Sequence, residues 1–285
     1  MHCRRSPGTR RDVATARSYA DAMPEGDTIH RAAARLRPAL VGATVTRFEA
    51  PRLVGARPWP GAVIDAVEAQ GKHLLIHFDS GLSVRTHMRM SGVWHAYRVG
   101  ERWAKPAHLA RVVIEVDRGW VAVCFSAPVV ETYRRDTGAR ALAALGPDLT
   151  TLDLAQDSAL DDVLARLAAA DPRTELGVAL LDQRIAAGVG NVFKSEVCWA
   201  VRLDPFTPIG DLDETTRRAI WTTAAEQLQA NLGPGRRRTH PRGLAVYRRD
   251  RRPCHACGTP IRMARQGEHQ RSTYWCPRCQ PRHGR

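Results

Sequence analysis

Two Cys-x-x-Cys pairs near the C-terminus constrain the fold of this chain more than any other feature. Cys254 and Cys257 are followed, after eighteen residues, by Cys276 and Cys279. Each pair can place two thiolates on one tight turn, and a hairpin can unite both turns as the tetrahedral four-sulfur shell of a structural zinc site. We therefore expect one structural Zn²⁺ with no open position for catalysis. Two redox or disulfide pairs are the alternative, which a reducing compartment disfavours.

The positive charge of the chain is concentrated at its ends. The formal net charge is +14, and residues 234–285 alone hold fourteen Arg against Asp250 and Glu268. Residues 1–22 add a net +3, so the remaining body is close to −1. A basic block of this density is typical of polyanion binders, because each neutralised phosphate releases condensed counterions. A disordered solubilising tail is the alternative, but the cysteine pairs lie inside the block.

The chain contains a second apparent start at Met23-Pro24-Glu25-Gly26-Asp27. Residues 1–22 lack the apolar segment of a secretory signal, and no run of the chain approaches the roughly 18 to 20 apolar residues of a membrane span. Basic residues are almost all Arg, which suggests a GC-rich bacterial coding sequence, where start codons are easily misplaced. We interpret residues 1–22 as a misassigned start or a disordered, removable extension; a transit peptide is the alternative. We expect a cytoplasmic protein with no membrane partner.

The hydrophobic patterns predict an α+β multidomain chain. Helical periodicity covers residues 28–40, with Asp27 or Thr28 as the expected N-cap. Short strands punctuated by Gly, Pro and Asp follow as far as residue 133, typical of a β-sandwich or barrel. Spacing and composition then predict helices. The predicted strands cover 63–67, 73–78, 82–86, 111–116 and 120–123, and the predicted helices cover 160–170, 176–184, 192–201 and 215–232.

The stretch Ala187-Gly188-Val189-Gly190-Asn191 predicts a tight double turn between two helices. Glycines two residues apart permit the turn, and Asn191 is well placed to cap the following helix. Exposed amides at such a helix N-terminus can receive a phosphate of a nucleic-acid backbone. An ordinary helix hairpin is the alternative.

Together these motifs resemble the formamidopyrimidine-DNA glycosylase / endonuclease VIII family, nearer the endonuclease VIII branch. The resemblance spans Met23 to Gln280. The motifs that carry it are Met23-Pro24-Glu25-Gly26, Gln70-Gly71-Lys72-His73-Leu74-Leu75, His87-Met88-Arg89-Met90-Ser91-Gly92, the stretch from Leu181-Asp182-Gln183 to Glu196, and Gln270-Arg271-Ser272-Thr273-Tyr274-Trp275-Cys276.

The resemblance implies a fold and its domains. These are an N-terminal catalytic β-sandwich with a leading helix at 23–145, a helix-two-turn-helix domain at 146–250 and a four-cysteine zinc-finger hairpin at 251–285.

The resemblance also implies that Pro24 is the nucleophile, after removal of the initiator Met. Its secondary amine would attack C1′ of the damaged nucleotide, expel the base and form an iminium. An α-amino group has a pKa of about 7.7 to 8.0, so part of it is neutral at working pH. Glu25 matches the acid/base residue that protonates the sugar ring oxygen. Helix-start punctuation for Pro24 and a first-turn acid for Glu25 are the alternatives.

Five further residues match family positions that contact DNA. Lys72 would contact phosphate beside the lesion and assist catalysis. Asn191 and Arg271 would grip the backbone around the flipped nucleotide, and Met90 with Arg89 would fill the hole in the duplex. The alternatives are a solvated turn for Lys72, capping for Asn191, surface charge for Arg271 and core packing for Met90.

Two departures from the family pattern limit these expectations. Asp27 and Thr28 replace a Pro and an acidic residue, so a secondary acid there is missing. The segment from Asn231 to Val246 is short and Arg-rich, which favours oxidised pyrimidines over 8-oxoguanine.

We expect a bifunctional DNA glycosylase/AP lyase of base excision repair that acts by β,δ-elimination. It would be a nucleoid-associated monomer whose partner is damaged DNA, duplex or single-stranded. An 8-oxoguanine- or formamidopyrimidine-preferring glycosylase, or a non-catalytic abasic-site binder that retains residues 1–22, remains the alternative.

Overall fold

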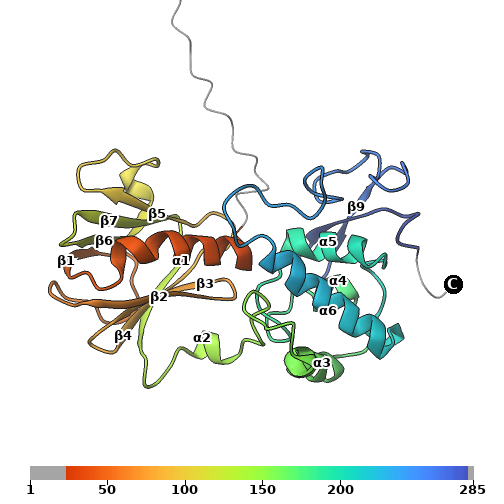
Figure 1. The fold of residues 1–285 in the computed structure, drawn as a ribbon, viewed down its shortest axis with the longest axis horizontal. Coiled ribbons are helices and arrows are strands. Elements are labelled where there is room, and N and C mark those ends of the chain that lie inside the picture. Colours follow the sequence, from red (N-terminus) through yellow and green to blue (C-terminus); the bar gives the residue numbers. More distant parts are fainter. Residues whose placement is uncertain (1–23, 282–285) are drawn as a thin grey trace, which may run out of the picture.

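The structure, a computed structural model, describes residues 24–281. The predictions for residues 1–22 and for Met23 therefore lie outside the described residues. The described chain forms a β-sandwich, a helical domain and a two-stranded hairpin, in that order (Figure 1). This confirms the predicted α+β architecture. Within the described range, no helix is long and apolar enough to cross a membrane.

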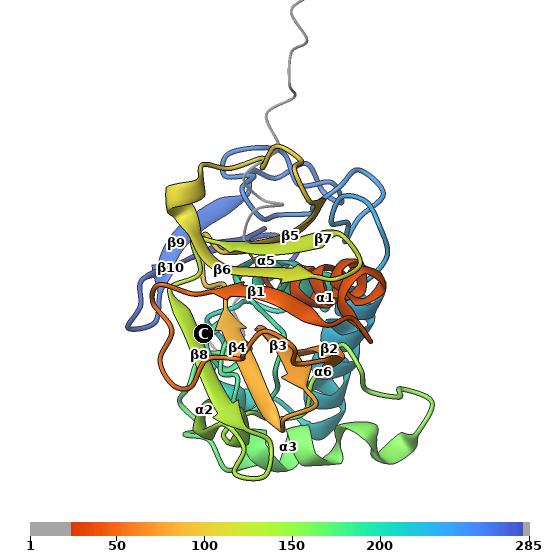
Figure 2. The same ribbon diagram turned by 90° about the vertical axis from the view of Figure 1, so that its left-hand side faces the viewer.

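The β-sandwich consists of two antiparallel four-stranded sheets that face each other (Figure 2). Alternate residues of both sheets point inward and form one core, which includes Ile64, Ile76, Val84 and Ile114. The first sheet has the order β1 (Val45–Glu49), β6 (Ala110–Val116), β7 (Trp120–Phe125) and β5 (Val93–Arg98). The second has the order β2 (Ile64–Gln70), β3 (His73–Phe78), β4 (Leu82–His87) and β8 (Val129–Arg134).

Helix α1 (Gly26–Leu40) packs along the sandwich and buries the predicted apolar stripe. Its first turn faces the helical domain (Figure 1). The predicted caps Asp27 and Thr28 are wrong, because the helix begins at Gly26, two residues before the predicted start, and its N-cap is Glu25. Glu25 has extended backbone and makes no side-chain cap of its own helix, since its carboxylate is directed into the neighbouring domain.

The helical domain is built around α5 (Asn191–Ala200) and α6 (Glu214–Gln229), which pack through buried Phe193 and Trp221. The predicted helix over 176–184 is shorter, because Gln183 leaves the helical path and binds the double turn. Its amide accepts from the Gly188 amide at 3.1 Å and donates to the Val189 carbonyl at 3.1 Å. The other elements are α2 (Arg140–Ala143), α3 (Asp161–Ala168), α4 (Leu176–Ala179), and the 3-10 turns η1 (Ala107–Leu109), η2 (Asp157–Leu160) and η3 (Ile209–Asp211).

The C-terminal hairpin pairs β9 (Arg262–Gln266) with β10 (Arg271–Trp275) and docks on α5. The buried Lys194 ammonium donates to Thr273 Oγ1 at 2.6 Å, and the Asn191 amide donates to the Ser272 carbonyl at 2.8 Å. These bonds fix the strand directly beside Arg271. The hairpin is therefore attached to the N-terminal half of α5.

Candidate active site

The Glu25 carboxylate lies at the N-terminus of α5, in the other domain. It accepts hydrogen bonds from the backbone amides of Val192 at 2.7 Å, Gly190 at 3.1 Å and Phe193 at 3.2 Å. Only 1% of Glu25 is exposed. Glycine at position 190 permits this approach, since an added Cβ would lie 2.3 Å from Glu25 Cδ. The carboxylate thus supplies the cap that α5 lacks from its own residues.

This arrangement corrects two predictions for the double turn. The amides expected to receive a phosphate are occupied by Glu25. Asn191 is the first residue of α5 instead of its cap, and its side chain binds the hairpin. The physical reason is that an internal carboxylate reaches the helix N-terminus and satisfies donors that a phosphate would otherwise satisfy.

Lys72 lies in the β2–β3 turn, near enough to Glu25 for each charge to affect the other. Burial lowers the pKa of Lys72 to about 8, although the Glu25 charge opposes this shift. Burial also raises the pKa of Glu25 above its ordinary value, while Arg237 and Lys72 act in the opposite direction. A carboxyl whose pKa is raised by burial keeps its proton more readily than an exposed one, as a proton donor requires.

Two contacts between the domains position Pro24, Glu25 and Lys72. The Gly26 amide donates to the Gly188 carbonyl at 2.9 Å, which attaches the start of α1 to the double turn. The Asp148 carboxylate accepts from the Gly71 amide at 2.5 Å, directly beside Lys72. Pro24 is partly exposed and adjacent to Glu25 in the chain. These contacts hold the start of α1 and the β2–β3 turn against the helical domain.

Met90, Arg89 and Arg271 lie on the exposed surface. Met90 is 54% exposed, which excludes the alternative of core packing. The Arg271 Nη1 atom lies 3.7 Å from Met90 Sδ, so the zinc hairpin and the β4–β5 loop meet here. Arg89 has left-handed backbone, and its amide donates to His87 Nδ1 at 3.2 Å. The structure thus brings Met90 and Arg271 together, with Arg89 next to Met90 in the chain.

A neutral histidine pair supports this loop. Burial, with the charges of Lys72, Arg85 and Arg89, lowers the pKa of His87 to about 4. Burial, with the charges of His87, Arg85 and Lys72, lowers the pKa of His73 to about 3. Arg85 Nη1 donates to His73 Nδ1 at 2.7 Å, and the two rings meet edge to face. Both rings therefore act as hydrogen-bond acceptors at Nδ1.

Sequence reasoning missed the partner of Asp27. Arg237 Nη2 donates to Asp27 Oδ1 at 2.6 Å and Nε donates to Oδ2 at 2.9 Å. Asp27 therefore forms a buried ion pair with the segment after α6. No signal in the sequence distinguishes Arg237 from Arg236 and Arg238. The buried position of Lys194 was likewise not predictable from its motif.

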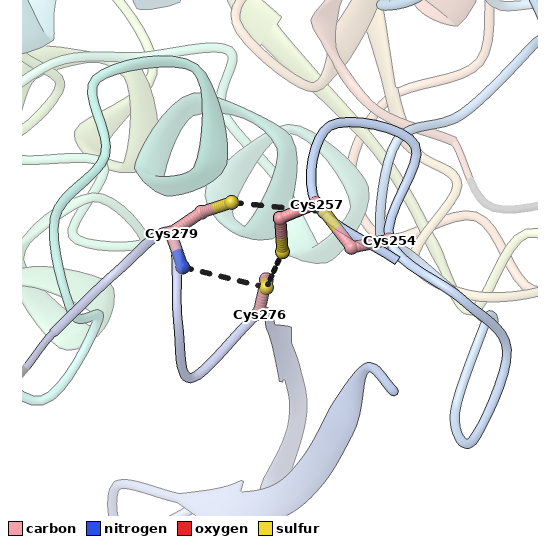
Figure 3. Close-up of side chains that lie close together, drawn as sticks. All are labelled: Cys254, Cys257, Cys276 and Cys279. Carbon is pink, nitrogen blue, oxygen red and sulfur yellow. Dashed lines mark hydrogen bonds between the residues drawn. The ribbon is translucent and has the colours of Figure 1, made fainter. Parts of the chain in front are cut away.

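The four cysteines converge as the spacing predicts (Figure 3). All four sulfurs lie within 4.8 Å of one another, with Cys254–Cys279 and Cys257–Cys276 separations of 3.8 and 3.4 Å. Tetrahedral zinc with Zn–S bonds of about 2.3 Å requires S···S distances of about 3.8 Å. The donor set fits one structural Zn²⁺. The four cysteines do not form disulfides in this structure, since their sulfur–sulfur separations far exceed the covalent S–S length of about 2.05 Å.

Comparisons with known proteins agree with this geometry. The family model of the formamidopyrimidine-DNA glycosylase N-terminal domain matches residues 23–127. The formamidopyrimidine-DNA glycosylase H2TH domain matches 145–240, and the zinc finger found in FPG and IleRS matches 252–282. These matches, together with the clustered cysteines, confirm the structural zinc.

Relatives cover nearly the whole chain. The chain is 44% identical to the "Probable endonuclease 8 2" of Streptomyces coelicolor over 267 residues, covering 90% of this chain and 94% of that protein. It is 40% identical to "DNA-(apurinic or apyrimidinic site) lyase Nei2" of Mycolicibacterium smegmatis, covering 90% and 99% of the two chains. The crystal structure of MutM (Fpg) from Thermus thermophilus superposes with a TM-score of 0.73 at 27% identity, covering 92% and 100%. The chain belongs to the formamidopyrimidine-DNA glycosylase / endonuclease VIII family.

Proposed function

We propose that this protein is a bifunctional DNA glycosylase and AP lyase of base excision repair. The observation that carries the proposal is that Glu25 caps the helix after the double turn and interacts electrostatically with Lys72, with Pro24 next to Glu25 in the chain. The names of the relatives, endonuclease 8 and DNA-(apurinic or apyrimidinic site) lyase, support the same reaction. A nucleophile, an acid/base and a cation are the groups that the reaction requires.

Pro24 is the proposed nucleophile. Its neutral nitrogen attacks C1′ and forms a bond to it as the bond from C1′ to the damaged base breaks. The departing base takes the electron pair of the broken bond and the proton that the amine loses. Glu25 donates a proton to the sugar ring oxygen, so the ring opens to an iminium. Proton removal from C2′ then expels the 3′-phosphate, and a second elimination expels the 5′-phosphate, leaving a one-nucleotide gap. Hydrolysis of the iminium releases the sugar fragment and restores the amine.

This chemistry requires a free amine at Pro24. A proline nitrogen within a peptide bond has no available lone pair, so the active form begins at Pro24. The start of the family match at residue 23 supports this proposal. The intact mass of the protein made in its own host tests it.

DNA is held, on this proposal, at the junction between the domains. Lys72 contacts the phosphate beside the lesion, and Arg271 offers a planar fork of donors to the next phosphates. Asn191 contacts the DNA backbone, and it also acts indirectly. Its side-chain amide holds the strand that carries Arg271. Met90 enters the space left by the flipped nucleotide, with Arg89 at its side. The protein acts as a monomer on chromosomal DNA.

Oxidised pyrimidines are the proposed lesions. The segment from Asn231 to Val246 is short, and Arg237 attaches it to α1 beside Glu25. The family resemblance links a short segment at this place to pyrimidine lesions and a longer one to oxidised purines. The "Endonuclease 8" of Klebsiella pneumoniae, 31% identical over 280 residues, belongs to the same group of relatives.

A lesion panel tests this function. Pro24-first protein is incubated with duplexes and single strands that contain thymine glycol, 5-hydroxycytosine, 8-oxoguanine or an abasic site. We expect strand cleavage with phosphate at both ends of the gap, faster at the two pyrimidines than at 8-oxoguanine. Tight binding without cleavage of any substrate would establish the non-catalytic binder instead.

A further inference from the structure

A buried ion pair joins α1 to the segment after α6. The Asp27 side chain has no exposed surface, and that of Arg237 is 1% exposed. Two parallel hydrogen bonds, at 2.6 and 2.9 Å, connect the guanidinium to the carboxylate. Arg237 also donates to Thr28 Oγ1 at 2.9 Å. The guanidinium is therefore held in one orientation by three bonds to the first turn of α1.

The same guanidinium faces the proposed acid/base. Arg237 Nη1 lies 4.0 Å from Glu25 Oε1, and both side chains are almost fully buried. Asp27 holds the other edge of the fork, so Arg237 cannot approach Glu25 as a bidentate partner. In a site from which water is excluded, a charge at this distance strongly affects ionisation.

The charged groups around Glu25 come from five parts of the chain. Lys72 of the β2–β3 turn and Arg237 favour the carboxylate, and Asp27 of α1 disfavours it. The Glu25 charge also affects the pKa of Lys194 of α5 and the pKa of Tyr247. The amine of Pro24 adds a sixth titratable group in the active form. Among the protein charges that act on Glu25, Arg237 has the largest effect.

Stability alone does not account for such a pair. Desolvation of two buried charges can cancel their attraction, and replacement by apolar residues is often neutral or stabilising. A positive charge fixed beside a proton-transfer residue has a direct chemical effect, however. We propose that Asp27 and Arg237 are positioning residues that hold this charge at a set distance from Glu25 and thereby determine the pH range of base removal. This inference rests on the proposed glycosylase function.

Single variants of the two partners make opposite predictions. Arg237→Met removes the positive charge, so the pKa of Glu25 rises and the pH–rate profile moves up by about 1 pH unit. Asp27→Asn removes the opposing negative charge, so the pH–rate profile is displaced to lower pH. Arg237→Lys keeps the charge and leaves the profile near that of the wild type. The measurement is the single-turnover rate of thymine glycol removal between pH 5.5 and 9, with thermal unfolding recorded for each variant.

A double variant separates charge from folding. Asp27→Asn/Arg237→Met removes both fully buried charges, and Arg31, the second and partly exposed partner of Asp27, keeps its bond to the Gly235 carbonyl. We therefore expect the double variant to unfold closer to the wild-type temperature than Arg237→Met alone. Its pH–rate profile is still displaced to higher pH than that of the wild type, because Arg237 acts on Glu25 more strongly than Asp27 does. Arg238→Met, which removes an exposed charge one residue away, serves as the control and leaves the profile in place.

The outcomes distinguish this inference from the proposed function. Opposite displacements in the two single variants support the positioning role. Slower rates in both variants, with pH–rate profiles at the same pH as the wild-type profile, would overturn it. The ion pair would then have only a structural role. Absence of base removal by the wild-type protein would instead refute the glycosylase itself, whatever the variants do.

Discussion

At the residue scale, Glu25 combines two tasks. Its carboxylate caps α5 and also lies beside the proposed nucleophile. The sequence predicted the chemical role of Glu25 through a family motif, but not the cap, because the two partners are 167 residues apart in the chain. Local patterns carry no information on such a contact. The same limit applies to Asp27 and Arg237, which are 210 residues apart.

Glu25→Gln is predicted to abolish base removal and leave DNA binding largely intact. The amide has nearly the same shape but cannot transfer the proton, so we expect a rate lower by a factor of about 100 to 10,000. Single-turnover excision and equilibrium binding to a duplex with an abasic analogue measure the two effects. Glu226→Gln on the exposed face of α6 is the control. Comparable excision by both variants would refute the assignment of Glu25.

Gly190→Ala is predicted to displace Glu25 and to lower both stability and rate. The new methyl group would lie 2.3 Å from Glu25 Cδ, so the carboxylate must leave the amides of α5. Loss of a cap and of its buried hydrogen bonds costs about 1 to 3 kcal/mol. Urea unfolding gives this value, with Gly233→Ala in open space as the control. Unchanged stability in Gly190→Ala would contradict the observed position of Glu25.

Acid is predicted to destabilise the β-sandwich through His73 and His87. Their pKa values are lowered from 6.5 to about 3 and about 4, so the unfolded chain binds more protons in the intervening range. Stability therefore falls as pH drops from about 6.5 to about 4, by up to about 1.4 kcal/mol per pH unit for each histidine. Urea unfolding at several pH values should show a shallower slope for His73→Gln. The exposed His108→Gln should retain the wild-type slope, and equal slopes for both variants would contradict the prediction.

At the element scale, two elements that are buried along most of their length followed their sequence patterns. The strand predicted over 73–78 is β3, and the helix predicted over 192–201 is α5 within one residue at each end. The helix predicted over 176–184 ends early, because Gln183 makes tertiary hydrogen bonds that a periodicity cannot indicate. Buried elements were thus predictable residue by residue, whereas the more exposed strands β1, β5 and β8 were covered only by the general strand pattern up to residue 133.

Zinc removal is predicted to weaken DNA binding before it affects the β-sandwich. The hairpin carries Arg271, and its small core depends on the cysteines. Chelation or Cys257→Ser should therefore release the hairpin, with a loss of affinity and a salt slope reduced by about 1 when the Arg271 contact is lost. Fluorescence anisotropy measures the affinity, and added Zn²⁺ should restore it after chelation. Full affinity in metal-free protein would contradict a DNA-binding role of the hairpin.

At the scale of the whole molecule, the site exists only where the domains meet. Three hydrogen bonds connect the β-sandwich side to the helical side. They join Glu25 to Val192, Gly26 to Gly188 and Gly71 to Asp148. The family motifs predicted which residues take part, and the spacing of the cysteines predicted that their four sulfurs converge. The use of the double-turn amides by Glu25 could not be predicted, because either an internal carboxylate or a phosphate satisfies them.

Borohydride trapping on abasic-site DNA tests the central claim most directly. The protein is compared in two forms, one that begins at Pro24 and one that retains residues 1–23, and each adduct is located by peptide mass. The account predicts a covalent adduct at the Pro24 nitrogen of the first form and no adduct with the second. An adduct on Lys72, or no adduct with the Pro24-first protein, would contradict it.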